Sequence, residues 1–185
     1  MASNAPDGAG RQPAPLTPRA REIAAAAREI LEDEGPDALT MRRIAERLGI
    51  RAPSLYKHFP DKAALEAAII SAAFEEQAAA FERAVEGSDD PLAALGAAYR
   101  RFALAHPHLY RLMTDQELRR DLLAPGVEER AGLPVYRAAG EDADRARAAW
   151  AFAHGMALLE LANRFPPAAD IDAAWRVGLG AFRGD

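Results

Sequence analysis

Apolar residues recur every three or four positions along most of the chain, which is the spacing of one face of an α-helix. Between residues 18 and 34 this face holds Ile23, Ala27, Ile30 and Leu31, and a Gly-Pro pair follows. No segment shows the alternating, β-branched pattern that is typical of a strand. The sequence therefore predicts an all-α protein.

Capping residues and helix breakers divide this pattern into separate helices. Threonine or aspartate stands where most of the predicted helices begin, and these side chains accept hydrogen bonds from the first turn. The helices predicted after the first span residues 40–48, 53–59, 61–87, 91–105, 107–113, 134–139, 142–164 and 170–182. Between residues 115 and 140, two prolines and three glycines interrupt the pattern, so only the short helix over 134–139 is predicted there.

The second and third predicted helices form a helix-turn-helix pattern around Gly49. Their apolar positions complete a compact three-helix unit with the first helix, and these positions are Met41, Ile44, Ala45, Leu48, Leu55 and Phe59. The residues expected to point outward are Arg42, Arg43, Arg51, Ser54, Tyr56, Lys57 and His58. Basic, short polar and aromatic side chains of this kind can contact phosphates and base edges.

Charge makes this unit stand out from the rest of the chain. The whole sequence of 185 residues carries a net charge of −5, but residues 40–65 hold six basic residues against two acidic ones. A basic face can simply be solvated. Here a tyrosine lies between the basic residues of a helix-turn-helix, and Lys62 stands at the start of the next helix, where backbone N–H groups favour an anion. These features together favour duplex DNA as the partner.

The stretch "TMRRIAERLGIRAPSLYKHFPDKAAL" resembles the DNA-binding signature of the tetracycline-repressor (TetR) family of bacterial regulators, over residues 18–70. The resemblance implies that the third helix enters the major groove. It implies that Thr40 caps the second helix and touches phosphate, that Arg42 approaches a base or phosphate, and that Lys62 holds phosphate. The implied reading face comprises Ala52, Pro53, Ser54, Tyr56, Lys57 and His58. Ala52 departs from the longer polar side chains that are common at its position.

The resemblance implies two domains and a function. Residues 1–16 lack periodicity and are predicted to be a flexible tail, residues 17–62 the DNA-binding domain, and residues 63–185 an effector-binding and dimerisation domain. The expected function is that of a sequence-specific transcriptional regulator, a repressor released by an unidentified small-molecule effector. The alternative is a TetR-like ligand- or partner-binding module that does not bind an operator.

The stretch from Trp150 to Ala162 supports dimerisation on physical grounds. Only His154 and Glu160 are polar there, so the helix is apolar nearly all the way round and one side must face a partner. Gly155 and the glycines of the last helix suit a close approach, and Ala157 is expected at the seam. Alternatively, both helices belong to the core of a monomer. A two-fold homodimer through the last two helices implies a near-palindromic operator.

The second half of the chain also resembles the C-terminal domain class named for its Trp-His-Gly motif, over residues 92–184. That class implies a four-helix dimer interface and an effector pocket inside the central helices. The candidate ligand contacts are Tyr99, Phe102, Tyr110, Met113, Trp150 and His154. Each of these residues could instead be ordinary core.

Enzymatic, metal and membrane functions find no support in the sequence. It has no cysteine, no Gly-rich phosphate loop and no GxSxG or HExxH motif, so neither an enzyme nor a cofactor is expected. His106 and His108 flank a proline without a carboxylate at ligand spacing, so no metal site is expected. The longest apolar run is too short to span a bilayer and no secretory signal is seen, which predicts a cytoplasmic protein without membrane contact.

Overall fold

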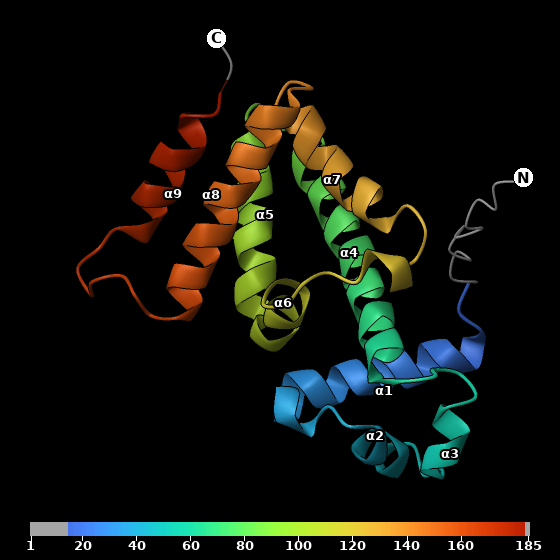
Figure 1. Ribbon diagram of the computed structural model, residues 1–185. Coiled ribbons are helices and arrows are strands. Elements are labelled where there is room, and N and C mark those ends of the chain that lie inside the picture. Colours follow the sequence, from blue (N-terminus) through green and yellow to red (C-terminus); the bar gives the residue numbers. More distant parts are fainter. Residues whose placement is uncertain (1–14, 184–185) are drawn as a thin grey trace, which may run out of the picture.

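The computed structural model describes residues 15–183, and these residues form nine α-helices and no strand (Figure 1). The predicted tail over residues 1–16 lies almost wholly outside the described residues. The first three helices form a unit at one end of the molecule: α1 (Pro18–Glu34), α2 (Met41–Arg47) and α3 (Ala52–Leu55). A 3-10 turn, Pro36–Ala38, joins α1 to the segment before α2.

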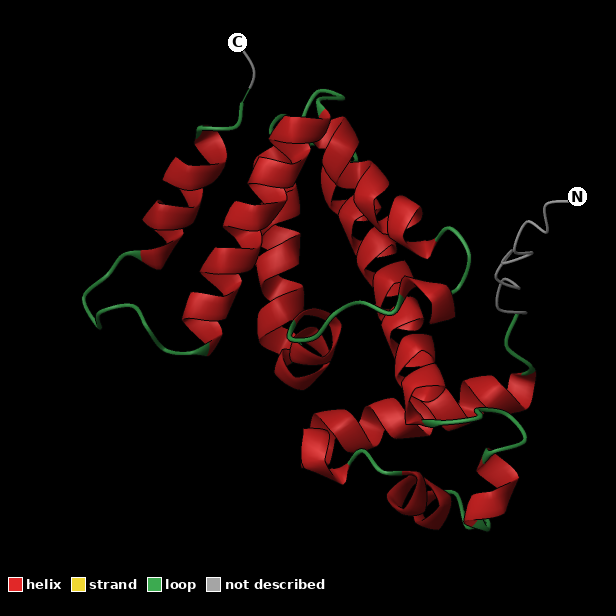
Figure 2. Cartoon of the chain, in the orientation of Figure 1, coloured by secondary structure: helices red, strands yellow, loops and turns green. Residues whose placement is uncertain are grey.

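The larger domain holds the remaining helices. They are α4 (Lys62–Val85), α5 (Pro91–Ala105), α6 (Pro107–Thr114), α7 (Val127–Ala138), α8 (Ala143–Leu161) and α9 (Ile171–Gly180). The long α4 extends from the small unit through the whole domain, α7 runs along it, and α9 packs on both α5 and α8 at the edge of the domain (Figures 1 and 2). Helix α9 is therefore an outer layer, and one of its sides is left uncovered.

Side-chain caps explain where most of the helices begin. A threonine or aspartate oxygen accepts a backbone N–H two or three residues ahead in six helices, and the capping residues are Thr17, Thr40, Asp61, Asp90, Asp142 and Asp170. Each cap satisfies an N–H group that has no partner inside the helix. All six helix starts expected from these residues are confirmed.

The third helix is shorter than the sequence predicts. Regular α-helix covers only residues 52–55, and the chain continues as a turn in which the N–H groups of His58 and Phe59 both bond to the carbonyl of Leu55. Pro60 follows directly, and a proline disfavours helical geometry in the residue before it. Leu55 and Phe59 are nevertheless buried, as expected, so the turn keeps the predicted facing.

Helix α7 corrects the prediction for residues 115–140. The sequence predicts only a short helix over 134–139, but the helix spans Val127–Ala138 with Gly132 and Pro134 in its interior. Its buried residues are Val127, Ala131, Pro134 and Val135, which recur at helical spacing. Because this face packs along α4, burial outweighs the poor helix propensity of the two interior breakers. A second short 3-10 turn, Arg120–Leu122, precedes it.

The last two helices pack on the rest of the domain through glycines. A Cβ atom at Gly178 would overlap the ring of Phe152 on α8, and one at Gly96 on α5 would overlap the Leu179 side chain on α9. Gly178 is therefore needed inside the protomer, and it does not by itself indicate a partner. Ala157, expected at a dimer seam, is wholly buried at 0% exposure. Its side of α8 faces the protomer core, which corrects that expectation.

A cluster of charges joins the two domains. Arg28 on α1 pairs with Glu32 at 2.9 Å on its own helix and with Glu76 at 2.5 Å on α4. His106, between α5 and α6, lies 3.2 Å from the Glu32 carboxylate. These contacts hold α1 against the middle of α4, so the orientation of the small unit is coupled to that of the long helix.

Candidate functional site

The outer face of the helix-turn-helix carries the residues predicted to read DNA. Tyr56 is 52% exposed and Lys57 and Pro53 are exposed as well, while Leu55 and Phe59 face the core. The side chains at Ala52, Ser54 and His58 are partly buried at the edges of this face. The expected outward facing of Tyr56 is therefore confirmed.

The start of α2 presents two further polar groups on this side. The Thr40 hydroxyl oxygen accepts the Arg43 backbone N–H at 3.1 Å, which leaves its own O–H available as a donor. The side chain of Arg42 is 89% exposed and its Nε donates to Glu46 at 2.9 Å within the same helix. A pair between side chains this exposed contributes little energy, so Arg42 can exchange its carboxylate for a phosphate.

Arg43, which is expected to point outward, already has a carboxylate partner in the structure. Its Nε and Nη2 donate to the two carboxylate oxygens of Glu34 at 2.9 and 2.7 Å, a bidentate pair between α2 and the end of α1. This hydrogen bonding lowers the pKa of Glu34. Arg47 makes a similar bond to Glu29 on α1. Two of the three arginines of α2 therefore hold the helix-turn-helix together.

The remaining cations of the face differ in how they are held. Lys62 pairs with Glu66 at 3.2 Å, one turn further along α4. Arg51 and Lys57, in contrast, make no ion pair within residues 15–183. These two exposed side chains on either side of Tyr56 are the cations that can meet a polyanion without breaking an internal contact.

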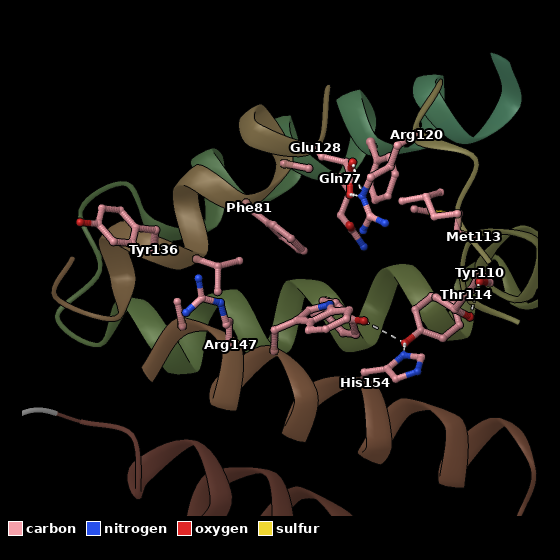
Figure 3. Close-up of a pocket in the computed structure, with 18 of the residues that line it drawn as sticks. Gln77, Phe81, Tyr110, Met113, Thr114, Arg120, Glu128, Tyr136, Arg147 and His154 are labelled. Carbon is pink, nitrogen blue, oxygen red and sulfur yellow. Dashed lines mark hydrogen bonds and ion pairs between the residues drawn. The ribbon is translucent and has the colours of Figure 1, made fainter. Parts of the chain in front are cut away.

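The second candidate site is a cavity of about 540 Å³ enclosed by helices α4 to α8 (Figure 3). Five of the six predicted ligand contacts line it: Tyr99, Tyr110, Met113, Trp150 and His154. Phe102 does not line it, because its side chain is turned away and packs on the ring of His106 with centroids 5.3 Å apart. Trp150 is half exposed and stacks on His154 at the mouth.

A chain of hydrogen bonds crosses the lower wall of the cavity. The hydroxyl groups of Tyr99 and Tyr110 are 2.9 Å apart, and the Tyr110 hydroxyl is 2.6 Å from Nδ1 of His154 (Figure 3). If Tyr99 donates to Tyr110 and Tyr110 donates to Nδ1, both phenol protons have an acceptor. The opposite order leaves the Tyr99 proton without an acceptor within residues 15–183, so the first order is favoured.

Burial keeps this chain uncharged. It raises the pKa of Tyr99 and of Tyr110 well above the ordinary tyrosine value, and it lowers the pKa of His154 below 6.5. Near neutral pH the imidazole is therefore neutral and able to accept at Nδ1.

Several residues of the cavity wall were not predicted from the sequence. Phe74, Gln77 and Phe81 come from α4, and Val135 comes from α7. The three positions on α4 follow the three- and four-residue spacing of a single face, so that periodicity was the available signal. Val135 could not be placed, because the extent of α7 was not predicted.

Neither a metal-binding cluster nor a helix that could span a membrane is found in residues 15–183. No group of three or more histidine, cysteine, aspartate or glutamate side chains in this range is arranged to hold a metal ion. Among the same residues, no helix combines the length and the apolar character that crossing a bilayer requires.

Two family models match the chain. The model described as "Bacterial regulatory proteins, tetR family" matches residues 23–75, and the one described as "Tetracyclin repressor-like, C-terminal domain" matches residues 92–182. The first match contains the helix-turn-helix, and the second contains α5 to α9. The second description does not mention the Trp-His-Gly class, so that assignment stays a prediction.

Two individual relatives are similar to parts of the chain. A helix-turn-helix-type transcriptional regulator of Mycobacterium tuberculosis, described as uncharacterised, is 31% identical over 144 residues, 71% of this chain and 65% of the relative. The class C tetracycline repressor of Escherichia coli is 52% identical over 44 residues, 24% of this chain and 20% of the repressor. The match thus spans less than two thirds of each of these two relatives.

A solved structure is similar over nearly the whole chain. A protein of unknown function from Rhodococcus sp. RHA1 superposes with a TM-score of 0.72 at 30% identity. The match covers 93% of this chain and 97% of the Rhodococcus chain. The arrangement of both domains is therefore shared with a known structure.

Proposed function

The chain belongs to the TetR family of bacterial regulatory proteins, and we propose that it is a sequence-specific DNA-binding repressor whose operator affinity is controlled by a small-molecule effector. The observation that carries the proposal is the face around Tyr56. An exposed aromatic side chain lies between Arg51 and Lys57, two cations that form no ion pair in the described part of the chain. The helix-turn-helix that carries them is tied to α1 by the ion pairs of Arg43 and Arg47.

DNA recognition by this face divides into two kinds of contact. Arg42, Arg51, Lys57 and Lys62 supply charge for the phosphate backbone, which gives affinity without sequence information. Tyr56 and the edge residues of α3 reach the bases and supply selectivity. One such face covers only part of a groove, so a second copy is needed for a long site.

A homodimer through α8 and α9 supplies that second copy. The outer side of α8 carries the exposed residues Ala148, Ala151, Leu159 and Ala162, and Gly155 on the same stripe has open space beyond it. On α9, Val177 is 76% exposed. Two-fold pairing of this apolar surface places two reading faces on successive major grooves, about 34 Å apart, and requires a near-palindromic operator.

The cavity between α4 and α8 is the effector site. Its wall includes Phe74, Gln77 and Phe81 of α4, the helix that also carries the small unit through the pair between Arg28 and Glu76. A ligand that favours one position of α4 changes the separation of the two reading faces. It lowers operator affinity only if it binds the two positions of α4 with different affinity.

The DNA-binding proposal is tested with Lys57→Ala on a duplex selected from a random library. Binding of the wild type, followed by fluorescence anisotropy, should fall steeply with salt, because each phosphate contact contributes a log–log slope of about −0.9. Lys57→Ala should reduce that slope by about 1.

Arg83→Ala is the matched control, since Arg83 is an exposed cation near the far end of α4. It should leave the slope unchanged. Salt-independent binding, or no selected duplex that binds, would favour a TetR-like module that does not bind an operator, whereas equal slopes for the two variants would show that Lys57 does not contact a phosphate.

A further inference from the structure

The interior of the cavity contains no unpaired charge among the residues that line it. The charged groups at its rim are Arg120, which pairs with Glu128 at 3.0 Å, and Arg147, which pairs with Asp144 at 2.7 Å. Both arginine side chains are largely exposed to solvent. A charged ligand in the interior would lose its hydration, and the two arginines of the lining are exposed to solvent at the rim, where screening weakens their attraction for it.

The walls favour an aromatic ligand. Phe74, Phe81, Tyr99, Tyr110 and Trp150 surround the cavity, with Phe81 and Tyr99 stacked at a centroid distance of 6.0 Å. Rings of this kind bind flat apolar surfaces by stacked or edge-on contact. A volume of about 540 Å³ also suits a drug-sized molecule.

Gln77 supplies the polar group of this wall. Its side chain comes from α4 and points into the cavity between Phe81 and Arg120 (Figure 3). The residue is only 6% exposed, yet its amide takes part in none of the side-chain hydrogen bonds among residues 15–183. This primary amide opens onto the cavity and has both a donor and an acceptor to offer.

The polar chain on the opposite wall has a different character. The protons of Tyr99 and Tyr110 are already used within the chain that ends at His154, and all three groups are neutral. The two phenol protons therefore need no ligand, whereas the Nε2 proton of the neutral imidazole makes no hydrogen bond to another side chain of residues 15–183. Gln77 is the lining side chain on the opposite wall that offers both a donor and an acceptor.

We propose that the cavity binds an uncharged aromatic molecule whose amide, carbonyl or hydroxyl group pairs with Gln77, and that it excludes anions and cations of the same shape. This inference rests on the proposed function in treating the cavity as the effector site. It adds the chemical class of the ligand and the residue that selects it.

Probes built on one diphenylmethyl framework separate shape from charge. Diphenylacetamide is neutral and can pair with an amide, and diphenylacetate is its near-isosteric anion. Benzhydrylammonium is a cation, and diphenylmethane has no polar group. Isothermal titration calorimetry of the wild type should give diphenylacetamide at least about tenfold higher affinity than either ion, a difference of about 1.4 kcal/mol. Equal or tighter binding of diphenylacetate would overturn the proposal, as would the failure of every probe to bind.

Variants of Gln77 locate the contact. In Gln77→Leu, diphenylacetamide should lose its advantage over diphenylmethane, because the hydrogen bond is gone and the apolar walls remain. In Gln77→Glu, the affinity for benzhydrylammonium should rise about tenfold relative to that for diphenylacetamide, because a carboxylate in the cavity is stabilised by a bound cation. Gln77→Met replaces Gln77→Leu if the latter does not fold by circular dichroism. If the order of the probe affinities is the same as in the wild type both for the apolar variant and for Gln77→Glu, the ligand binds elsewhere and the assignment is overturned.

The same proteins distinguish this inference from the proposed function. Intact binding of the selected duplex together with no binding of any probe would overturn the ligand class and leave the DNA-binding function standing. Tight, Gln77-dependent binding of diphenylacetamide that does not release the duplex would support the ligand class and contradict effector-controlled release.

Discussion

His154 shows how burial sets the state of a single residue. Its imidazole is held in the neutral form by partial burial, which lowers its pKa, and Nδ1 accepts the Tyr110 hydroxyl at 2.6 Å. Protonation would convert Nδ1 into a donor, which could no longer accept this bond without rearrangement of the tyrosine chain. The hydrogen bonds of this cavity wall therefore depend on the protonation state of His154, and so on pH.

The sign of this link can be worked out from the direction of the shift. Because the pKa of His154 is lower in the folded protein than in the unfolded chain, the unfolded chain binds a proton first as the pH falls. Stability is thus full above the unfolded value of about 6.5 and is lost as the pH falls through the folded value.

We expect urea denaturation of the wild type to show a larger loss of stability between about pH 7 and pH 5 than denaturation of His154→Gln. Glutamine keeps a polar side chain but does not titrate, and all other titrating groups are common to both proteins. A wild type that gains stability relative to the variant on acidification would show that the imidazole is charged in the folded protein.

At the scale of the elements, α8 and α9 each contain a glycine whose surroundings differ sharply. A Cβ atom at Gly178 on α9 would meet the ring of Phe152 from α8, whereas a Cβ atom at Gly155 on α8 would have nothing within 4 Å. The first glycine is required by the packing of two helices in one protomer. Nothing within 4 Å in the protomer requires the second glycine.

Alanine substitutions at the two glycines should therefore act in opposite directions on the isolated protomer. Gly178→Ala should lower the free energy of unfolding by about 1–3 kcal/mol, because the Phe152 ring must move as a whole. Gly155→Ala should raise it by up to about 1 kcal/mol, since alanine favours the helix. Thermal denaturation at low protein concentration, where association is weakest, measures both effects. Equal losses would mean that Gly155 is also packed within the protomer.

At the scale of the whole molecule, the proposed dimer depends on the exposed apolar surface of α8 and α9. Leu159 on α8 is 43% exposed and Val177 on α9 is 76% exposed. Arg100 anchors the inner side instead, bonding to Glu160 on α8 at 2.7 Å and to Asp172 on α9 at 2.5 Å. Trp175 adds a bond to Glu160 at 2.6 Å.

Val177→Glu, alone or with Leu159→Glu, should convert a dimer into folded monomers with strongly reduced operator affinity, because a charge would be buried at the two-fold seam. Sedimentation velocity at micromolar concentration measures the assembly. Leu133→Glu is the matched control, since Leu133 is an exposed leucine on α7, away from this surface. A wild type that sediments as a monomer would contradict the dimer and the half-site spacing together.

The local parts of this protein follow from its sequence. Caps such as Thr40 and Asp61 act within one turn, and the alternation of Leu55 and Phe59 with Tyr56 decides what faces outward within a single short helix and its turn. Both depend on neighbours in the chain, so periodicity and capping rules predict them. The class of fold, the helix-turn-helix and five residues of the cavity wall were predicted for this reason.

Only the tertiary structure decided the features that join distant segments. Helix α7 forms despite Gly132 and Pro134 because α4 covers its buried face, and no rule of local propensity contains that partner. Arg43 pairs with Glu34 on α1, and Ala157 faces the protomer core rather than a partner. Gln77 comes to face a cavity only because residues from five helices line that cavity together. Packing between elements determines which side of a helix is buried and which residues cover it. The sequence of a single helix does not specify which other helices will lie against it.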